Sequence, residues 1–143
     1  MKINVLLIFC AILSINSFSQ NKIIDSLEKL IPTQTDSTLA GTYNELTWQY
    51  RLVDRDKAIM YGNKAIELAI KIKYPKSIAQ AYNDLGIIYY DKENFDTAVF
   101  LYYKAIAIRK QLKDYLGIAK LYNKIGILYQ QKGVFDKIGR AHV

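Results

Sequence analysis

The stretch AYNDLGIIYY, residues 81–90, decides how this chain folds, because a close copy of it, LYNKIGILYQ, follows at residues 121–130. A weaker copy precedes both, with the interval shortened from forty to thirty-nine residues. Identical pairs at the interval of forty include Lys64/Lys104, Ala65/Ala105, Ile66/Ile106, Ala79/Ala119, Tyr82/Tyr122, Asn83/Asn123, Gly86/Gly126 and Tyr89/Tyr129. Periods of this length are typical of proteins built from stacked repeats.

Apolar residues inside each unit recur at helical spacing on two separate segments. The first set is Tyr82, Leu85, Ile88 and Tyr89, and the second is Ala98, Leu101, Tyr102, Ala105 and Ile108. A polar turn over residues 91–96 separates them, so each unit is predicted to be two antiparallel helices. A glycine inside a helix costs about 1 kcal/mol relative to alanine. We therefore expect Gly86 to allow close packing against a small residue of the second helix, Ala98.

These residues resemble the tetratricopeptide repeat family. The family pattern is met by Tyr82, Leu85, Gly86, Tyr89, Ala98, Tyr102 and Ala105, and Tyr122, Ile125, Gly126 and Tyr129 repeat its first half. The first unit is degenerate, with Thr47 in place of the glycine and Gly62 in place of Tyr102. The period of forty exceeds the usual 34 residues, so we interpret the chain as a variant with longer helices.

The resemblance implies an all-α fold, an α-α superhelix in which antiparallel hairpins stack as a solenoid. The units are predicted at residues 39–78 and 79–118, with an incomplete third unit at 119–137. Asp136 is expected to begin the second helix of this third unit, which is truncated. Its first helix would then expose an apolar face, leaving the chain marginally stable or prone to associate.

Residues 1–19 have the layout of a signal peptide. Lys2 precedes an apolar run from Ile3 to Ile15, too short to span a bilayer, and small residues end the segment. We expect cleavage after Ser19 and an exported, periplasmic or extracytoplasmic protein; the alternative is a buried N-terminal helix. The only cysteine, Cys10, lies in this segment, which excludes disulfides and thiolate chemistry from the mature chain.

Two flanking segments lie outside the repeats. Residues 20–38 are predicted to form an amphipathic helix (Ile23, Ile24, Leu27, Leu30, Ile31) and a linker, and to cap the end of the solenoid. Residues 138–143, IleGlyArgAlaHisVal, match no helical position of the repeat and equal one reading frame of a common sequencing adapter. We interpret them as an adapter artefact, in which case the natural protein continues past Lys137; the alternative is a short natural tail.

The formal charge is +7. Six of the basic residues fall near the ends of two predicted helices, where cations suit the helix dipole: Lys71, Lys73, Lys76, Arg109, Lys110 and Lys113. This favours a solvated basic face over a nucleic-acid surface, although RNA binding by the helical repeats is an alternative. The acidic cluster Asp91, Glu93 and Asp96 lacks the spacing of a calcium loop. Because an aspartate recurs as Asp56, Asp96 and Asp136, helix N-capping is the preferred interpretation.

Catalytic and metal-binding chemistry is not expected. The only histidine, His142, lies in the suspect tail, so zinc sites and histidine-activated nucleophiles cannot be assembled. Glycine-rich phosphate loops are also absent from the sequence. We predict no cofactor, no metal and no enzymatic activity.

The resemblance also implies a binding surface, because the first helices of tetratricopeptide repeats line a concave groove. Carried over by position, the groove residues are Asn44, Trp48, Arg51, Asn83, Ile87, Tyr90, Asn123, Ile127 and Gln130. The three asparagines form a ladder whose amides either bind a peptide backbone or bond within the scaffold. Trp48 is either a groove anchor or a core residue.

The predicted function is therefore a non-catalytic protein–protein interaction module that binds a partner peptide or helix in this groove. The alternative is the N-terminal extracytoplasmic sensor part of a membrane-bound histidine kinase or helix-turn-helix transcriptional regulator. This alternative rests on a resemblance of the export signal, the forty-residue units and LeuThrTrpGlnTyrArg (residues 46–51) to such proteins of the Bacteroidetes group. The sequence beyond Lys137 would distinguish the two.

Overall fold

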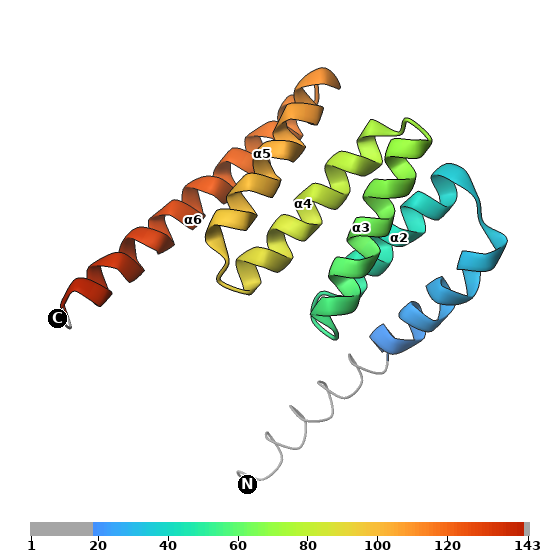
Figure 1. Ribbon diagram of the computed structural model, residues 1–143, viewed down its shortest axis with the longest axis horizontal. Helices are drawn as coiled ribbons and strands as arrows, with labels where there is room; N and C mark the ends of the chain where they lie inside the picture. The colour runs from blue at the N-terminus through green and yellow to red at the C-terminus, as the bar shows by residue number, and fades with distance from the viewer. Residues whose placement is uncertain (1–18, 142–143) are drawn as a thin grey trace, which may run out of the picture.

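Helices joined by short turns form a row in which each helix lies antiparallel beside the one before it (Figure 1). The computed structural model describes the backbone of residues 19–141 and the side chains of residues 19–133. Its elements are a helix over residues 19–30, the 3-10 helix η1 (Ile31–Thr33), and α-helices α2 (Asp36–Tyr50), α3 (Arg55–Lys71), α4 (Pro75–Asp91), α5 (Phe95–Gln111) and α6 (Tyr115–Ala141). The predicted all-α superhelix of stacked hairpins is confirmed.

Helices α2 and α3 form the hairpin of the first unit, and α4 and α5 that of the second. The first helix of the second unit also packs on both helices of the first. None of the described helices has the length and hydropathy needed to cross a membrane. The predicted signal segment up to Phe18, with Cys10, and the residue His142 lie outside the described residues.

The same turn closes three successive helices, α3, α4 and α5. Each turn places a residue with positive φ after the helix end, namely Lys73 (55°), Glu93 (58°) and Lys113 (56°). The following residue then donates its backbone N–H to a carbonyl five residues earlier, as Asn94 does to Tyr89 at 2.9 Å. This is the Schellman arrangement, in which glycine is the usual residue at positive φ. The turn repeats every twenty residues and sets the antiparallel pairing.

The helix caps differ from the sequence prediction. Asp54 caps α3 by accepting from the backbone N–H groups of Asp56 (3.1 Å) and Lys57 (3.0 Å), and Asn94 caps α5 by accepting from Thr97 (3.2 Å). The prediction that Asp56 and Asp96 are N-caps is therefore wrong. Both lie inside the first helical turn, where a carboxylate still suits the positive end of the helix dipole.

The partner of Gly86 also differs from the prediction. A Cβ atom at Gly86 would lie 2.5 Å from Cε1 of Tyr102, and its three nearest heavy atoms all belong to the Tyr102 ring. The close packing is thus between Gly86 and an aromatic ring of α5, and the expected pairing with Ala98 is wrong. Gly62 of α3 has a similar role at the preceding interface, where its Cβ would lie 2.6 Å from Leu85 of α4.

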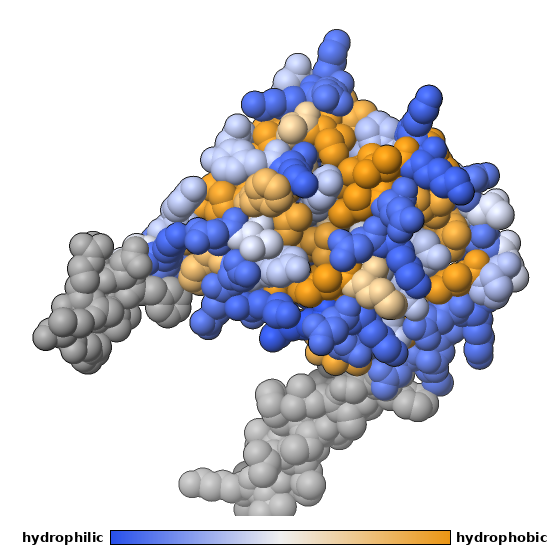
Figure 2. Space-filling model, viewed as in Figure 1, coloured by the Kyte–Doolittle hydropathy of each residue, from blue (hydrophilic) through white to orange (hydrophobic). Residues whose placement is uncertain are grey.

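Buried apolar side chains form two clusters along the row of helices. The first joins the helix over residues 19–30 to α2, α3 and α4, and the second joins α4, α5 and α6. Tyr82 and Tyr89 pack against both clusters. On the face seen in Figure 2, hydrophobic residues gather over the middle of the molecule and hydrophilic residues line much of its edge.

The N-terminal helix packs where the sequence predicts a cap, on the outer side of the first unit. Ile24 is buried against α2 and α3, and the Glu28 carboxylate accepts from the hydroxyls of Tyr50 (2.8 Å) and Tyr61 (2.9 Å). The predicted linker is shorter than expected, because α2 already begins at Asp36.

The third unit departs from the prediction at its turn. Asp136 does not begin a second helix, because α6 continues without a break from Tyr115 to Ala141. Continuation of α6 past Gly133 costs only about 1 kcal/mol of helix propensity, so the helical backbone persists.

Candidate functional site

A groove runs along the first helices of the units, α2, α4 and α6. It consists of four hollows of about 390, 280, 590 and 510 Å³. Neighbouring hollows share lining residues. Lys124 and Ile87 line both the first and the second hollow, and Tyr90 and Ile127 line both the second and the third. The hollows therefore form one connected surface, which we call the groove.

The structure brings all nine sequence-predicted groove residues to this surface. Each of them lines at least one of the four hollows: Asn44, Trp48, Arg51, Asn83, Ile87, Tyr90, Asn123, Ile127 and Gln130. They come together because positions forty residues apart occupy the same side of successive first helices. This shared side makes the groove continuous from one unit to the next.

Trp48 lies on the surface of α2 and not in the core, with 43% of its area exposed. The guanidinium carbon of Arg51 stands 4.2 Å above its ring, a cation–π contact. Arg51 also pairs with Asp91 of α4 at 3.6 Å. Arg51 therefore covers one face of the Trp48 indole, and the exposed part of the indole borders the groove.

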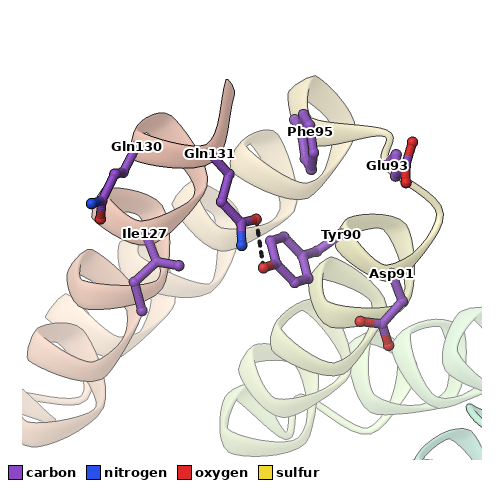
Figure 3. Close-up of a pocket in the computed structure, with 7 residues that line it drawn as sticks. All are labelled: Tyr90, Asp91, Glu93, Phe95, Ile127, Gln130 and Gln131. Atoms are coloured by element: carbon purple, nitrogen blue, oxygen red, sulfur yellow. Dashed lines mark hydrogen bonds between the residues drawn. The ribbon is translucent and has the colours of Figure 1, made fainter. Parts of the chain in front are cut away.

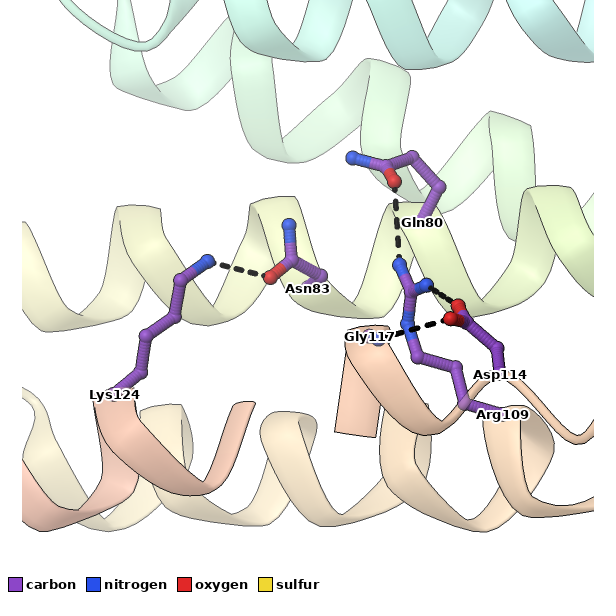
Figure 4. A network of polar contacts seen from close by, with 6 residues as sticks. All are labelled: Gln80, Asn83, Arg109, Asp114, Gly117 and Lys124. Carbon is purple, nitrogen blue, oxygen red and sulfur yellow. Dashed lines mark hydrogen bonds and ion pairs between the residues drawn. The ribbon is translucent and has the colours of Figure 1, made fainter. Parts of the chain in front are cut away.

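The asparagine ladder is partly engaged within the scaffold. Asn44 donates to the Ser77 hydroxyl at 2.8 Å, which ties α2 to the start of α4. Asn83 donates to Asp84 at 2.8 Å. It also accepts from Lys124 Nζ at 2.7 Å, which ties α4 to α6 (Figure 4). Asn123 is exposed on α6. Two of the three amides therefore position helices, whatever else they contact.

Asp84 and Lys124 form the electrostatic centre of the groove. Asp84 is 4% exposed and accepts from Gln80 at 2.9 and 3.0 Å. Burial raises the pKa of the Asp84 carboxyl, against the lowering effect of Gln80, Asn83 and Lys124. Burial likewise lowers the pKa of the Lys124 ammonium, which lies 5.7 Å from the centre of the Tyr102 ring.

An ion pair closes one end of the groove. Arg109, at the end of α5, donates to the Asp114 carboxylate and to Gln80 (3.4 Å), and Asp114 accepts from the Gly117 backbone N–H at 2.9 Å (Figure 4). The Gly117 N–H and the Arg109 guanidinium lower the pKa of the Asp114 carboxyl. Gly117 leaves no room for a Cβ, because one would meet both members of the pair.

The other end of the groove is aromatic and apolar. Tyr90 points from α4 toward α6 and donates its hydroxyl to Gln131 at 2.6 Å (Figure 3). The Phe95 ring lies 6.1 Å from the Tyr90 ring, and Ile127, 44% exposed, borders the same hollow. This end of the groove offers contacts for apolar side chains, and its polar rim offers hydrogen bonds.

Sequence reasoning missed the charged residues between the predicted positions, above all Asp84, Lys124 and Arg109. Asp84 follows directly after Asn83, and Lys124 directly after Asn123, so adjacency to the ladder was the available signal. Arg109 belongs to a second helix, which the positional argument did not consider.

The groove has the features of a binding surface. Among residues 19–133, no group of histidine, cysteine, aspartate and glutamate side chains is placed to hold a metal ion. The groove alternates amides, charges and apolar side chains along α2, α4 and α6. Such a surface can receive an extended peptide, whose backbone needs hydrogen bonds and whose side chains need apolar contacts.

Comparison with known proteins agrees with this architecture. The sequence model of the family described as tetratricopeptide repeat matches residues 39–111 and 77–138. The chain belongs to the tetratricopeptide repeat family. Repeats of this family generally mediate protein–protein interactions and are typically non-catalytic.

The crystal structure of BtubC (BKLC) from P. vanneervenii is similar to this chain, with a TM-score of 0.61 and 20% sequence identity. The match covers 85% of this chain and 56% of BtubC, so the chain spans little more than half of that protein's length. At this identity the likeness concerns the fold alone. No curated protein sequence matches the chain.

Proposed function

We propose that this chain binds a peptide or helical segment of a protein partner in the groove, without catalysis. The main support for the proposal is the connected surface along α2, α4 and α6, to which all nine predicted residues contribute. Exposed apolar groups on α2 and α6, Trp48 and Ile127, supply anchors. Partly buried polar groups between them, such as Lys124 and Asn83, orient the ligand. A wrong ligand would leave polar groups unpaired there and would lose binding free energy.

The experiment is selection of peptides from a random display library against the full chain, followed by titration of selected peptides against variants. The double variant Trp48→Ala, Ile127→Ala removes two exposed groove anchors, and we expect it to weaken binding about tenfold or more. The matched control is Phe100→Ala, because Phe100 is 57% exposed on the second helix α5 and lines none of the groove hollows.

Two results would contradict the proposal. One is that selected peptides bind the double variant as tightly as the unchanged chain. The other is that Phe100→Ala weakens binding more than the double variant does. Circular dichroism of all variants checks that helicity and melting are retained, since these three side chains are exposed and contribute little to the core.

We also propose that the protein is exported, on the basis of the layout of residues 1–19. Expression of the full sequence in a bacterium with a periplasm, followed by mass spectrometry of the mature N-terminus, tests this. A chain beginning at Gln20 in the periplasmic fraction is the expected result. An uncleaved cytoplasmic chain would contradict it. The sensor role is a second proposal, and the gene sequence beyond Lys137 tests it.

A further inference from the structure

Helices α4 and α6 present the same four residue types on the same face, but only α4 has that face covered. On α4 the face is Ala79, Tyr82, Gly86 and Tyr89, and on α6 it is Ala119, Tyr122, Gly126 and Tyr129. Ala79 is 1% exposed and Gly86 is buried. On α6, by contrast, Tyr122 is 45% and Tyr129 54% exposed, and Ala119 and Gly126 are exposed as well.

Helix α5 shows what covers such a face. Ala98, Tyr102 and Ala105 are all buried, and the Tyr102 ring fills the space beside Gly86. Lys104 Nζ lies 5.2 Å from the centre of the Tyr82 ring. The first unit repeats this last contact, with Lys64 5.9 Å from Tyr43. The covering helix therefore carries small, aromatic and small residues at fixed spacing, and a lysine two positions after the aromatic.

The way α6 packs against α5 leaves this face of α6 uncovered. Leu121, Ile125 and Leu128 are buried on an adjacent side of α6, against α5. A Cβ atom at Gly126 would have no heavy atom within 4 Å, so the space that Tyr102 fills beside Gly86 is open beside Gly126. No described residue covers this face, and none of its four residues lines the groove hollows.

We infer that the face formed by Ala119, Tyr122, Gly126 and Tyr129 is a second docking surface, whose partner is an amphipathic helix with the pattern of α5. The aromatic residue of that helix fills the space beside Gly126, its small residues allow close approach, and its lysine lies over the Tyr122 ring. This surface is separate from the groove, and its occupant is recognised by helix packing and not as an extended peptide.

A second copy of this chain is a poorer occupant. The face that a copy would offer is its own α6, where tyrosines would meet tyrosines, and the lysine two positions after Tyr122, Lys124, already donates to Asn83. Each copy also carries a formal charge of +7, which opposes association at low ionic strength. The occupant that we infer is therefore a helix with the α5 pattern.

The probe is a synthetic peptide of residues 94–111 in which a hydrocarbon staple joins positions 103 and 107, both exposed in α5. It is titrated against the full chain by fluorescence anisotropy up to about 1 mM. We expect saturable binding, and Gly126→Leu should weaken it about tenfold or more, because the leucine occupies the space for the aromatic ring. Gly126→Leu has open space, so the chain should still fold.

Control variants assign the binding to the face. Trp48→Ala changes the groove and should leave peptide affinity unchanged. In the peptide, Tyr102→Gly should abolish binding and Lys104→Glu should weaken it severalfold through loss of the cation–π contact.

Four results would overturn the inference. The first three are no binding at about 1 mM peptide, binding that Gly126→Leu leaves unchanged, and a dimer in light scattering that Gly126→Leu dissociates. Loss of peptide binding with Trp48→Ala alone would place the peptide in the groove. That last result would also contradict this inference, and it would leave the proposed groove function standing.

Discussion

The ring of Tyr102 occupies the space that a side chain at Gly86 would need, with Cε1 2.5 Å from the position of a Cβ atom. Tyr102 is 2% exposed, so a side chain at position 86 would have to displace a buried ring. The mid-helix glycine is therefore a packing requirement of the α4–α5 hairpin. Its counterpart Gly126 has no such neighbour, which provides an internal comparison at the same repeat position.

Gly86→Ala should destabilise the protein by about 1–2 kcal/mol, because the cost of overpacking exceeds the gain in helix propensity. Gly126→Ala should instead stabilise it by up to about 1 kcal/mol, since only the propensity gain applies. Urea unfolding followed by circular dichroism measures both. Equal shifts of the same sign at the two positions would contradict the packing argument.

Much of the architecture could be predicted from the sequence because repetition amplifies a weak signal. Tyr82 and Tyr122 occupy equivalent positions, so the helical spacing is observed more than once, and the nine groove positions follow from that register. The partner of Gly86 could not be predicted, because the choice between Ala98 and Tyr102 depends on how far α5 slides along α4. Spacing along one helix carries no information about that displacement.

The predictions for the helix caps and for the third unit failed for different reasons. Asp54 and Asn94 cap their helices while Asp56 and Asp96 lie two residues further on, and both positions of each pair are acidic or amide residues with capping ability. Periodicity selected the recurring aspartates, but turn geometry selects the cap. The continuation of α6 from Tyr115 to Ala141 shows that the recurrence of an aspartate at position 136 is not enough to start a new helix.

Positive φ at Glu93 offers a second test. A residue with a Cβ in the left-handed region is disfavoured by about 1 kcal/mol relative to glycine, and Glu93 is exposed at φ 58°. Glu93→Gly should therefore stabilise the chain by up to about 1 kcal/mol, less the entropy that glycine adds to the unfolded chain. Glu93→Ala keeps the strain and removes the charge, so a gain as large with alanine would contradict this reason. Thermal melting of both variants provides the measurement.

Asp84 should make stability depend on pH. Burial raises the pKa of its carboxyl in the folded protein, so the charged form is less favourable in the folded than in the unfolded state. Its contribution to stability is then fully present below the usual pKa and is lost as pH rises through the folded-state pKa. Asp84→Asn removes this titration and leaves an oxygen that can accept from Gln80 or Asn83.

The melting temperature of Asp84→Asn relative to the unchanged protein should therefore rise as pH increases from about 3.5, below the usual aspartate pKa, to neutrality. Differential scanning calorimetry across this range measures the difference. Lys124 and Glu45, the charged groups that act on Asp84, are unchanged in the variant. A difference that shrinks with rising pH would show that the charged carboxylate is net stabilising, through Lys124.

Glu28 should show the opposite sign. The Tyr50 hydroxyl, and then Tyr61 and Lys57, lower the pKa of the Glu28 carboxyl against the raising effect of burial. Its contribution is therefore present above the usual glutamate pKa and is lost as pH falls through the folded-state pKa. Hydrogen bonds to a charged group are stronger than those to a neutral one, so Glu28→Gln should cost about 1 kcal/mol at neutral pH. The cost should vanish in acid.

The same substitution tests whether Glu28 holds the N-terminal helix in place. Limited proteolysis should cleave the helix over residues 19–30 faster in Glu28→Gln than in Asp25→Asn, whose exposed carboxyl lies on the same helix. The combined variant with Tyr50→Phe and Tyr61→Phe should cost less than the sum of its single changes, because Tyr50→Phe and Tyr61→Phe each remove one of the two hydrogen bonds that Glu28→Gln weakens. Strict additivity would mean that the tyrosine hydroxyls and Glu28 act independently.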